Sequence, residues 1–231
     1  MNTYYLPSGI ILSIVSSNTS DLTIAIPFFL SHKTTTIKML SGLILPTSGS
    51  IKILDMDMKK DIFKIKEILN VSPQETAIAP NLTVKENLEF MAGVYQISNK
   101  EKKIDELIKQ FKLEEILNKR TKTLSGGWQR RLSIAISLIN NPKILFLDEP
   151  TLGLDVIARK ELWKVINELK GKITIILTTH YMEEAESLSD RIGIMANGKL
   201  VDVGTSEDLI KKTKTNNFED AFVSIATGGE L

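Results

Sequence analysis

Apolar runs and segments of helical spacing alternate along most of the chain. Ile144 to Leu147 is an uninterrupted apolar run, and Ile173 to Thr179 is a second strand-like run, as expected of parallel strands buried on both faces. Helical spacing lies between such runs, so the alternation predicts an α/β fold with a mostly parallel sheet flanked by helices. Between Gln74 and Gly126 the pattern is only helical. We therefore expect an inserted helical subdomain at about residues 75–140.

Local signals mark the ends of several elements. Thr83 to Glu86 has the form of a capping box that opens a helix, and Lys100 to Phe111 repeats the helical apolar spacing. Asn197-Gly198 between two apolar runs predicts a hairpin. Thr205 is expected to start a last helix. We expect residues 211–231 to form a poorly anchored C-terminal tail.

Composition agrees with a single domain that carries no membrane span of its own. The chain has 231 residues, of which 42% are hydrophobic, and a formal net charge of +1, which gives no reason to propose a nucleic-acid partner. It contains no cysteine, so disulfides and thiolate metal sites are excluded, in keeping with a cytoplasmic protein. Its apolar runs are shorter than the roughly 18 residues of a membrane helix. Any membrane association is therefore expected to come through a partner.

Two adjacent carboxylates end the first apolar run. Asp148 and Glu149 would lie at the carboxyl end of a buried strand, where open α/β sheets bind their ligands. The first suits a magnesium ion carrying a nucleoside triphosphate, and the second suits a water that must be oriented and deprotonated. Carboxylates that are merely solvated at a strand exit are the alternative. His180 would leave the sheet at the same edge, although a lone histidine there is usually an ordinary surface or core residue.

A small-residue turn precedes the carboxylates. Ser125-Gly126-Gly127 opens a helix whose apolar positions are Leu132, Ala135, Ile136 and Ile139. A helix start of this kind directs free N–H groups and a positive dipole end toward an anion. An ordinary serine cap followed by flexible glycines is the alternative interpretation.

Taken in order, these motifs resemble the nucleotide-binding subunit of ATP-binding cassette (ABC) transporters. The similar positions are Lys33-Thr34-Thr35 for the end of the phosphate-binding loop, Gln74 for the loop glutamine, Leu124 to Gly127 for the signature, Asp148-Glu149 for the Walker B pair, Leu152 to Asp155 for the D-loop and His180 for the switch histidine. The wording of Leu147 to Asp155 further resembles the subfamily that energises ABC-2 type exporters, including drug and antibiotic exporters. The resemblance implies a P-loop NTPase-like ATPase domain over residues 33–210.

ATP and Mg²⁺ are the cofactors that the resemblance implies. The residues implied to bind ATP are Lys33, Thr34, Thr35, Gln74, Ser125, Gly126, Gly127, Asp148 and Asp155. Those implied to hold magnesium, directly or through water, are Thr34, Gln74 and Asp148. Glu149 would polarise the attacking water, and His180 would contact the γ-phosphate and keep Glu149 aligned.

The resemblance also implies partners. Ser125-Gly126-Gly127 of one subunit would cover the γ-phosphate bound to the other, so a complete site needs a head-to-tail dimer, formed with itself or with a relative. Asp155 would lie across that interface. Separate transmembrane permease subunits would hold the chain peripherally at the inner face of the cell membrane.

The phosphate-binding loop departs from the family pattern. That loop reads G-x-x-x-x-G-K-[ST] because glycines adopt the required backbone angles and let N–H groups close on phosphates. Here Pro27 and His32 occupy the two glycine positions, and Leu30 occupies a usual internal glycine position. Pro27 also removes one backbone donor. A loop without these glycines puts nucleotide binding in question.

Residues 1–32 are where the resemblance is lost, and they contain one charged residue, Asp21, in a chain that is 25% charged. One hypothesis is a shifted reading frame or a misplaced start, so that translating the surrounding DNA in all frames would reveal a glycine-rich loop. The other is true divergence, in which Leu22 to Ile26 still forms the strand before an atypical loop. Tyr4 or Tyr5 would then be the candidate for stacking on adenine.

The sequence is compatible with three functions. The first is an ATPase subunit that drives export through separate membrane subunits, which the helical segment and the single-cassette length favour. The second is a non-catalytic or regulatory ABC subunit, which the altered phosphate loop favours. The third is a soluble ABC ATPase without a transport role, for which long coiled coils or tandem cassettes would be the sign, and the sequence contains neither.

Overall fold

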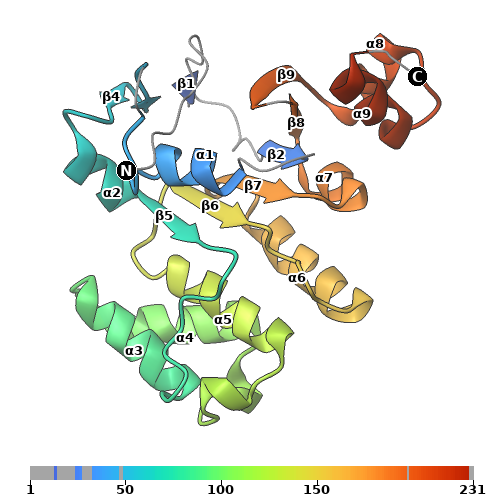
Figure 1. Ribbon diagram of the computed structural model, residues 1–231. Helices are drawn as coiled ribbons and strands as arrows, with labels where there is room; N and C mark the ends of the chain where they lie inside the picture. The colour runs from blue at the N-terminus through green and yellow to red at the C-terminus, as the bar shows by residue number, and fades with distance from the viewer. Residues whose placement is uncertain (1–12, 15–23, 28–32, 47–48, 197, 229–231) are drawn as a thin grey trace.

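A six-stranded sheet organises the molecule (Figure 1). The computed structural model describes residues 13–14, 24–27, 33–46, 49–196 and 198–228. In spatial order the strands are β5 (Leu69–Ser72), β6 (Ile144–Asp148), β7 (Thr174–Thr179), β2 (Ile24–Pro27), β8 (Arg191–Ala196) and β9 (Lys199–Gly204). The first five are parallel, and β9 is antiparallel to β8. The predicted α/β fold with a mostly parallel sheet is confirmed.

A smaller sheet lies beside the first. Its strands are β1 (Ser13–Ile14), β3 (Lys52–Ile53) and β4 (Met56–Asp57), with β1 parallel and β4 antiparallel to β3. Buried Ile53 packs in the same apolar cluster as the helices on that side of the large sheet. The small sheet therefore extends the core rather than forming one of its own.

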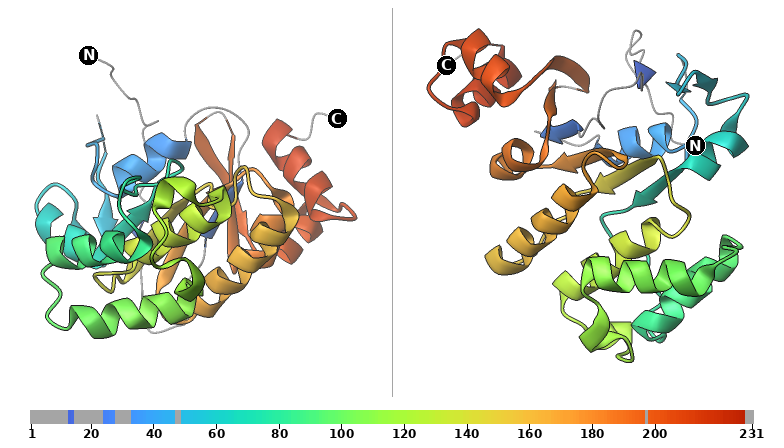
Figure 2. Two further views of the ribbon diagram at one scale, coloured as in Figure 1. Left: turned by 90° about the horizontal axis from the view of Figure 1, so that it is seen from below. Right: turned by 180° about the vertical axis from the view of Figure 1, so that it is seen from behind.

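Helices cover both faces of the large sheet (Figure 2). On one face are α1 (Lys33–Leu40) and α2 (Ile62–Ile68), and on the other are α3 (Val84–Val94), α4 (Lys100–Phe111), α5 (Gly126–Ser137), α6 (Val156–Leu169) and α7 (Met182–Leu188). Every side chain of β6 is buried, and they alternate between the two faces. Ile144 and Phe146 join the cluster under α1, while Leu145 and Leu147 join the larger cluster on the opposite face. This two-sided burial explains the uninterrupted apolar run.

The expected helical region is present between β5 and β6. Thr83 caps α3 through a capping box with Glu86, as predicted, and α4 has the predicted bounds. Two short 3₁₀ turns, η1 (Glu114–Ile116) and η2 (Thr121–Thr123), connect α4 to α5. In Figure 1 and in the right view of Figure 2, α3 to α5 lie at the end of the molecule opposite the C-terminal helices.

The C-terminal segment is more firmly packed than expected. The predicted hairpin is confirmed as β8 and β9, and Thr205 caps α8 (Ser206–Thr213). The expectation of a poorly anchored tail is wrong for α9 (Phe218–Thr227), because Phe218 and Phe222 are 1% and 2% exposed and pack in the larger core cluster. Their spacing of four residues places both rings on one helix face.

The N-terminal part contributes the strand at the centre of the sheet. β2 pairs with β7 on one side and β8 on the other, so a strand does precede α1, as the hypothesis of divergence requires. Residues 28–32 of the phosphate-binding loop, and the adenine candidates Tyr4 and Tyr5, lie outside the described residues. Within the described part of the chain, no helix has the length and apolarity to cross a bilayer.

Candidate functional site

The end of β6 brings the two predicted carboxylates to a buried position at the sheet edge. Asp148 is the last residue of the strand and lies in register with Thr178 of β7. The Thr178 hydroxyl donates to Asp148 Oδ1 at 2.7 Å, and the backbone N–H of Glu149 donates to the Thr178 carbonyl at 3.0 Å. These bonds fix the direction in which each carboxylate leaves the strand. The interpretation as merely solvated carboxylates does not fit, since Asp148 is 2% and Glu149 8% exposed.

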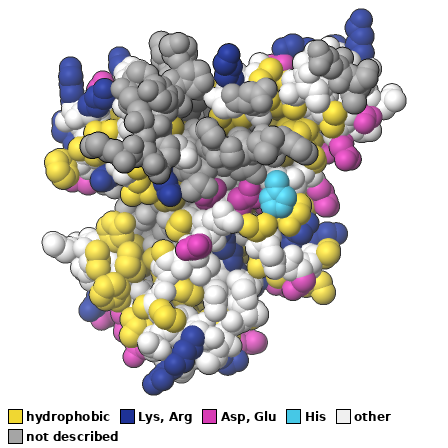
Figure 3. Space-filling view, viewed as in Figure 1, with side chains coloured by type: hydrophobic (Ala, Val, Ile, Leu, Met, Phe, Trp, Pro, Cys, Tyr) yellow, Lys and Arg dark blue, Asp and Glu magenta, His cyan; other side chains and the backbone are white. Residues whose placement is uncertain are grey.

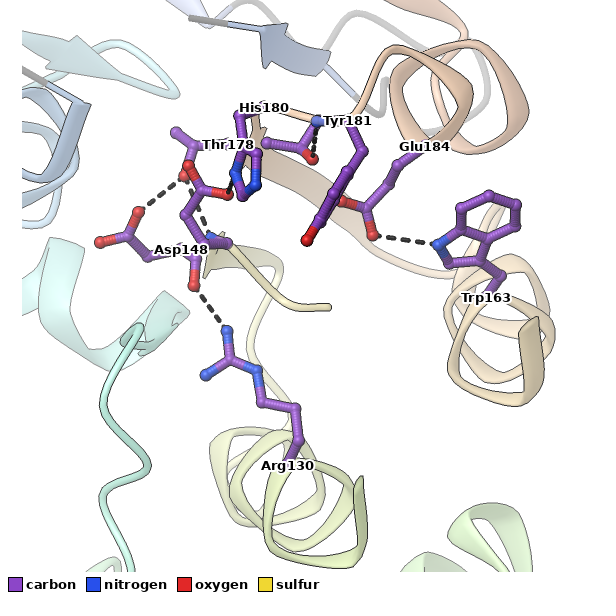
Figure 4. Close-up of polar contacts among 9 residues, drawn as sticks. Arg130, Asp148, Trp163, Thr178, His180, Tyr181 and Glu184 are labelled. Atoms are coloured by element: carbon purple, nitrogen blue, oxygen red, sulfur yellow. Dashed lines mark hydrogen bonds and ion pairs between the residues drawn. The ribbon is translucent and has the colours of Figure 1, made fainter. Parts of the chain in front are cut away.

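Glu149 and His180 form a close pair. His180 Nδ1 lies 2.6 Å from Glu149 Oε2, and the imidazole also stacks on Tyr181 with ring centroids 4.0 Å apart (Figure 4). Glu149 has a left-handed backbone with φ of 48°, which is uncommon for a residue other than glycine and is typical of functional sites. The sharp turn lets the chain leave β6 while the carboxylate stays beside the histidine.

The donor chemistry of this edge fits a magnesium ion bound together with a phosphate. Magnesium prefers oxygen ligands and is usually held by one or two carboxylates plus substrate phosphates and water. Asp148 supplies the carboxylate, and Gln74 lies on the exposed loop after the neighbouring strand β5, at the same edge. Among the described residues there is no cluster of three or more His, Cys, Asp or Glu that would form an all-protein metal site. A site of this composition therefore depends on ligand oxygens.

The other predicted phosphate-binding residues begin the helix that follows β2. Lys33, Thr34 and Thr35 are the first three residues of α1. β2 is parallel to β7, and Pro27 lies in register with Thr179, so the chain leaves β2 at the edge that carries His180. The topology thus brings the start of α1 to the same edge as the carboxylates.

The signature residues form the start of α5 with their backbone exposed. Ser125 is at the N-cap position, but its side chain makes no capping hydrogen bond, so the interpretation as an ordinary serine cap does not hold. Among the described residues, no hydrogen bond or ion pair joins Ser125-Gly126-Gly127 to Asp148 or His180. The exposed helix start is therefore free to contact a group outside this subunit.

Asp155 has a clear structural role in addition to its predicted one. Its carboxylate accepts hydrogen bonds from the backbone N–H groups of Ile157 and Ala158, both at 2.9 Å, and so caps α6. Around it, Leu152, Val156 and Ile157 are 40%, 63% and 74% exposed. The chain around the start of α6 thus presents an apolar surface a few residues beyond the carboxylates.

Two buried charged residues near the site were missed in the sequence. Arg130 of α5 is 4% exposed and donates to the Asp148 carbonyl at 2.5 Å (Figure 4). Burial lowers the pKa of its guanidinium to about 10, against the opposing effect of the nearby Asp148 carboxylate, so it stays charged at neutral pH. The sequence did contain a signal for Arg130, because it is a basic residue in a helix that packs on its apolar face. Charged residues on helices are usually exposed, however, so the signal did not indicate burial.

Glu184 of α7 is the second. It is fully buried, and the Trp163 indole N–H donates to its Oε1 at 3.0 Å (Figure 4). Burial raises the pKa of Glu184 above its usual range, while the hydrogen bond from Trp163 opposes this. Because its partners come from distant segments, the sequence alone offered no signal for it.

Comparison with known proteins agrees with the geometry. The family described as "ABC transporter" matches residues 31–152, more than half of the chain. The chain is 40% identical over 201 residues to "Probable multidrug ABC transporter ATP-binding protein YbhF" of Escherichia coli (strain K12). That similarity covers 84% of this chain and 35% of YbhF, so the chain spans about a third of the relative's length.

Two solved structures share the fold. "Structure of ATP binding subunit of ABC transporter" has a TM-score of 0.77 and 27% identity, and covers 89% of both chains. "Dimeric structure of a post-hydrolysis state of the ATP-binding cassette MJ0796 bound to ADP and Pi" has a TM-score of 0.70 and 26% identity, and covers 80% of this chain and 85% of that one. With the motif order, the sheet-edge carboxylates and the family match in agreement, the chain belongs to the ABC transporter family, as an ATP-binding domain.

Proposed function

We propose that this chain is the ATP-binding subunit of an exporter, which binds and hydrolyses MgATP at the interface of a head-to-tail dimer. The observation that carries this proposal is the hydrogen-bonded pair of Glu149 and His180 beside buried Asp148 at the carboxyl edge of the sheet. Residues 33–210 would form the ATPase domain, preceded by the atypical segment 1–32 and followed by the C-terminal segment 211–231.

In this proposal Glu149 is the general base. A carboxylate within reach of a water can orient it and accept its proton during attack on the γ-phosphate. The 2.6 Å contact with His180 Nδ1 restricts the Glu149 side chain to one orientation. Water reaches the pair because the histidine side chain is 39% exposed.

His180 has a second ring nitrogen for a phosphate. When Nδ1–H donates to Glu149, a neutral imidazole has no proton on Nε2 and cannot donate there. Donation from both nitrogens at once requires the imidazolium. His180 would then link the base to the γ-phosphate.

Asp148, Gln74 and Thr34 would hold the magnesium ion, and Lys33 and Thr35 would bind phosphate oxygens. Mg²⁺, when bound, neutralises phosphate charge and helps to orient the triphosphate. The Thr178 hydroxyl donates to Asp148 Oδ1 and so helps to fix the direction of that carboxylate. The protein's part is thus to position oxygen donors at one edge of a rigid sheet.

Two exposed features support a head-to-tail dimer. The start of α5 presents Ser125-Gly126-Gly127, and the Ser125 side chain makes no capping hydrogen bond. This arrangement is suited to cover a phosphate bound to the other subunit. The apolar surface of Leu152, Val156 and Ile157 would be buried by the same contact. Asp155, which caps α6 between them, would lie at that interface.

The helical region supports a membrane partner. At the end of α3, Phe90, Val94 and the C-cap residue Tyr95 are 59%, 56% and 37% exposed, which is unusual for large apolar side chains so close together. Hydrophobic side chains gather in the lower left part of the face shown in Figure 3. We assign this surface to transmembrane permease subunits, which would place the chain on the cytoplasmic face of the membrane.

Phosphate release from MgATP by the purified chain tests the proposal. We expect Glu149→Gln to lower turnover by about 10²–10⁴-fold, the range of general base catalysis, and to keep MgATP binding. Glu168→Gln, an exposed glutamate on α6, is the control and should retain wild-type turnover. Equal rates for the wild type and both variants would contradict the proposal.

A regulatory subunit without turnover is the second candidate, supported by the absence of glycines from Pro27 to His32. Calorimetric titration with MgATP, with Lys33→Ala as the control, distinguishes the two. Saturable binding that is lost in Lys33→Ala supports the ATPase. Absence of binding to the wild type supports the regulatory subunit.

A further inference from the structure

The guanidinium of Arg130 connects three separate segments around the site. Its Nε donates to the carbonyl of Pro150 at 2.9 Å and its Nη2 to the carbonyl of Asp148 at 2.5 Å. Its Nη1 donates to the carbonyls of Pro73 and Gln74, the latter at 3.2 Å. Within the described residues no carboxylate lies at ion-pair distance from it, so all four acceptors are main-chain oxygens.

These four carbonyls belong to two loops that leave the same sheet edge. Pro73 and Gln74 follow β5, and Asp148 and Pro150 lie at and beyond the end of β6, its parallel neighbour. Residues 73–82 form no helix or strand, so this loop lacks the regular hydrogen bonds that hold a strand in place. The planar, five-donor fork of an arginine can span two such loops, whereas the single ammonium of a lysine cannot.

Arg130 itself comes from a third segment, the helix that begins with the signature. It is in the second turn of α5, and α5 packs both on α3 and α4 and on β5 of the sheet. A displacement of the start of α5 would therefore act directly on both loops through one rigid, buried group.

We propose that Arg130 is a positioning residue that makes the start of α5, the Gln74 loop and the Asp148-Glu149 strand end move as one unit. This inference rests on the proposed function, in which Ser125-Gly126-Gly127 contacts the nucleotide of the second subunit. The contact at one nucleotide is then transmitted, through Arg130, to the magnesium ligands and the base that serve the other nucleotide. Arg130 thus couples the two sites of the dimer without touching either nucleotide.

Arg131 provides a matched control for the experiment. It is the next residue on the same helix and is 6% exposed, but its guanidinium pairs with Glu161 of α6 and lies over the Trp128 ring. Arg130→Lys and Arg131→Lys both keep the charge and remove the fork. Thermal unfolding and circular dichroism of the full-length chain first establish that both variants fold.

The measurement is hydrogen–deuterium exchange in peptides covering residues 73–82, without nucleotide and with MgATP, in the Glu149→Gln background. Without nucleotide, we expect the backbone amides of this segment to exchange about tenfold faster in Arg130→Lys than in the parent. The reason is that the contacts of Arg130 with the carbonyls of Pro73 and Gln74 are lost. On addition of MgATP, the parent and Arg131→Lys should slow their exchange, and Arg130→Lys should not.

Two results would overturn the inference. One is exchange in Arg130→Lys that matches the parent in both conditions, and the other is an equal change in Arg130→Lys and Arg131→Lys, which would indicate general loosening of α5. If the parent does not bind MgATP, the proposed function fails, and the nucleotide-free comparison alone decides whether Arg130 holds the loop. The two failures are therefore distinguishable.

Discussion

Thr178 shows how one hydroxyl at the end of a strand can organise an active site. It donates to Asp148 Oδ1 at 2.7 Å and accepts from the Glu149 backbone N–H at 3.2 Å, while being 1% exposed. Its place in register with Asp148 makes both bonds possible. The hydroxyl thus helps to set the direction of Asp148, the proposed metal ligand, and the position of Glu149, the proposed base.

Replacement of Thr178 by valine keeps the shape of the side chain and removes the hydroxyl. We expect Thr178→Val to destabilise the fold by about 1–3 kcal/mol, because buried Asp148 loses its donor, and to weaken MgATP binding. Urea unfolding and calorimetry provide the two measurements. Thr174→Val, at the start of the same strand, is the control, and an equal loss in that variant would contradict a specific role for the hydroxyl.

Glu184 should make stability depend on pH. Its pKa is raised by burial, so over the pH range between its unfolded and folded pKa values the folded state binds more protons than the unfolded state. Stability contributed by this group is therefore present at low pH and is lost as the pH rises through the folded pKa.

Glu184→Gln keeps an acceptor for the Trp163 indole and cannot ionise. We expect the stability of this variant relative to the wild type to increase as the pH rises from the ordinary glutamate range, and then to level off. Denaturant unfolding at a series of pH values measures this. A stability difference that is the same at every pH would show that the wild-type glutamate does not titrate as inferred.

The helix α9 is packed more firmly than its sequence pattern indicated. Phe222 is 2% exposed and packs in the larger core cluster, so truncating it leaves a cavity. We expect Phe222→Ala to lower the free energy of unfolding by about 3–5 kcal/mol. The exposed Glu219→Ala on the same helix should change it by less than about 0.5 kcal/mol. Similar values for both variants would mean that α9 is not anchored by its aromatic face.

Elements with strong local signals were predictable. The capping box at Thr83, the apolar strand ending at Asp148 and the turn at Gly198 each depend on neighbours in sequence, and each is present in the structure. That His180 leaves the sheet at the same edge as Asp148 was also predicted, because two parallel strands end there, whereas its alignment with Glu149 was implied only by the family resemblance. The order of strands in the sheet was not, since it depends on contacts between distant residues.

The same reasoning explains which site residues were missed. Arg130 and Glu184 act through carbonyls and an indole from segments far away in the chain, and nothing beside them in the sequence marks these contacts. The tail beyond Lys214 was underestimated for a different reason. Its apolar positions Phe218, Ala221, Phe222 and Ile225 share one face only when residues 218–227 are read as a helix.

At the scale of the whole molecule, the signature helix provides a direct test of dimer formation. A Cβ on Gly126 would meet only Leu154, at 4.0 Å, whereas a Cβ on Gly127 would approach Ala158 at 3.2 Å. A side chain therefore has more room at Gly126 than at Gly127, where Ala158 would have to shift.

In the Glu149→Gln background, we expect Gly126→Glu to abolish the MgATP-dependent dimer, because the added carboxylate would face the phosphates of the other subunit. Analytical ultracentrifugation with and without MgATP measures the dimer, and the melting temperature of the monomer provides the control for folding. Persistence of the dimer at wild-type strength would place the interface elsewhere on the molecule.

The central position of β2 also determines the order in which the molecule is completed. Ile24 pairs with Ile176 of β7 and with Arg191 of β8, which are synthesised near the other end of the chain. On the ribosome, this strand therefore waits until both of its partner strands have been made. Such distant pairing slows folding and leaves strand edges exposed in the nascent chain, so this protein should depend on chaperones more than one built from sequential hairpins.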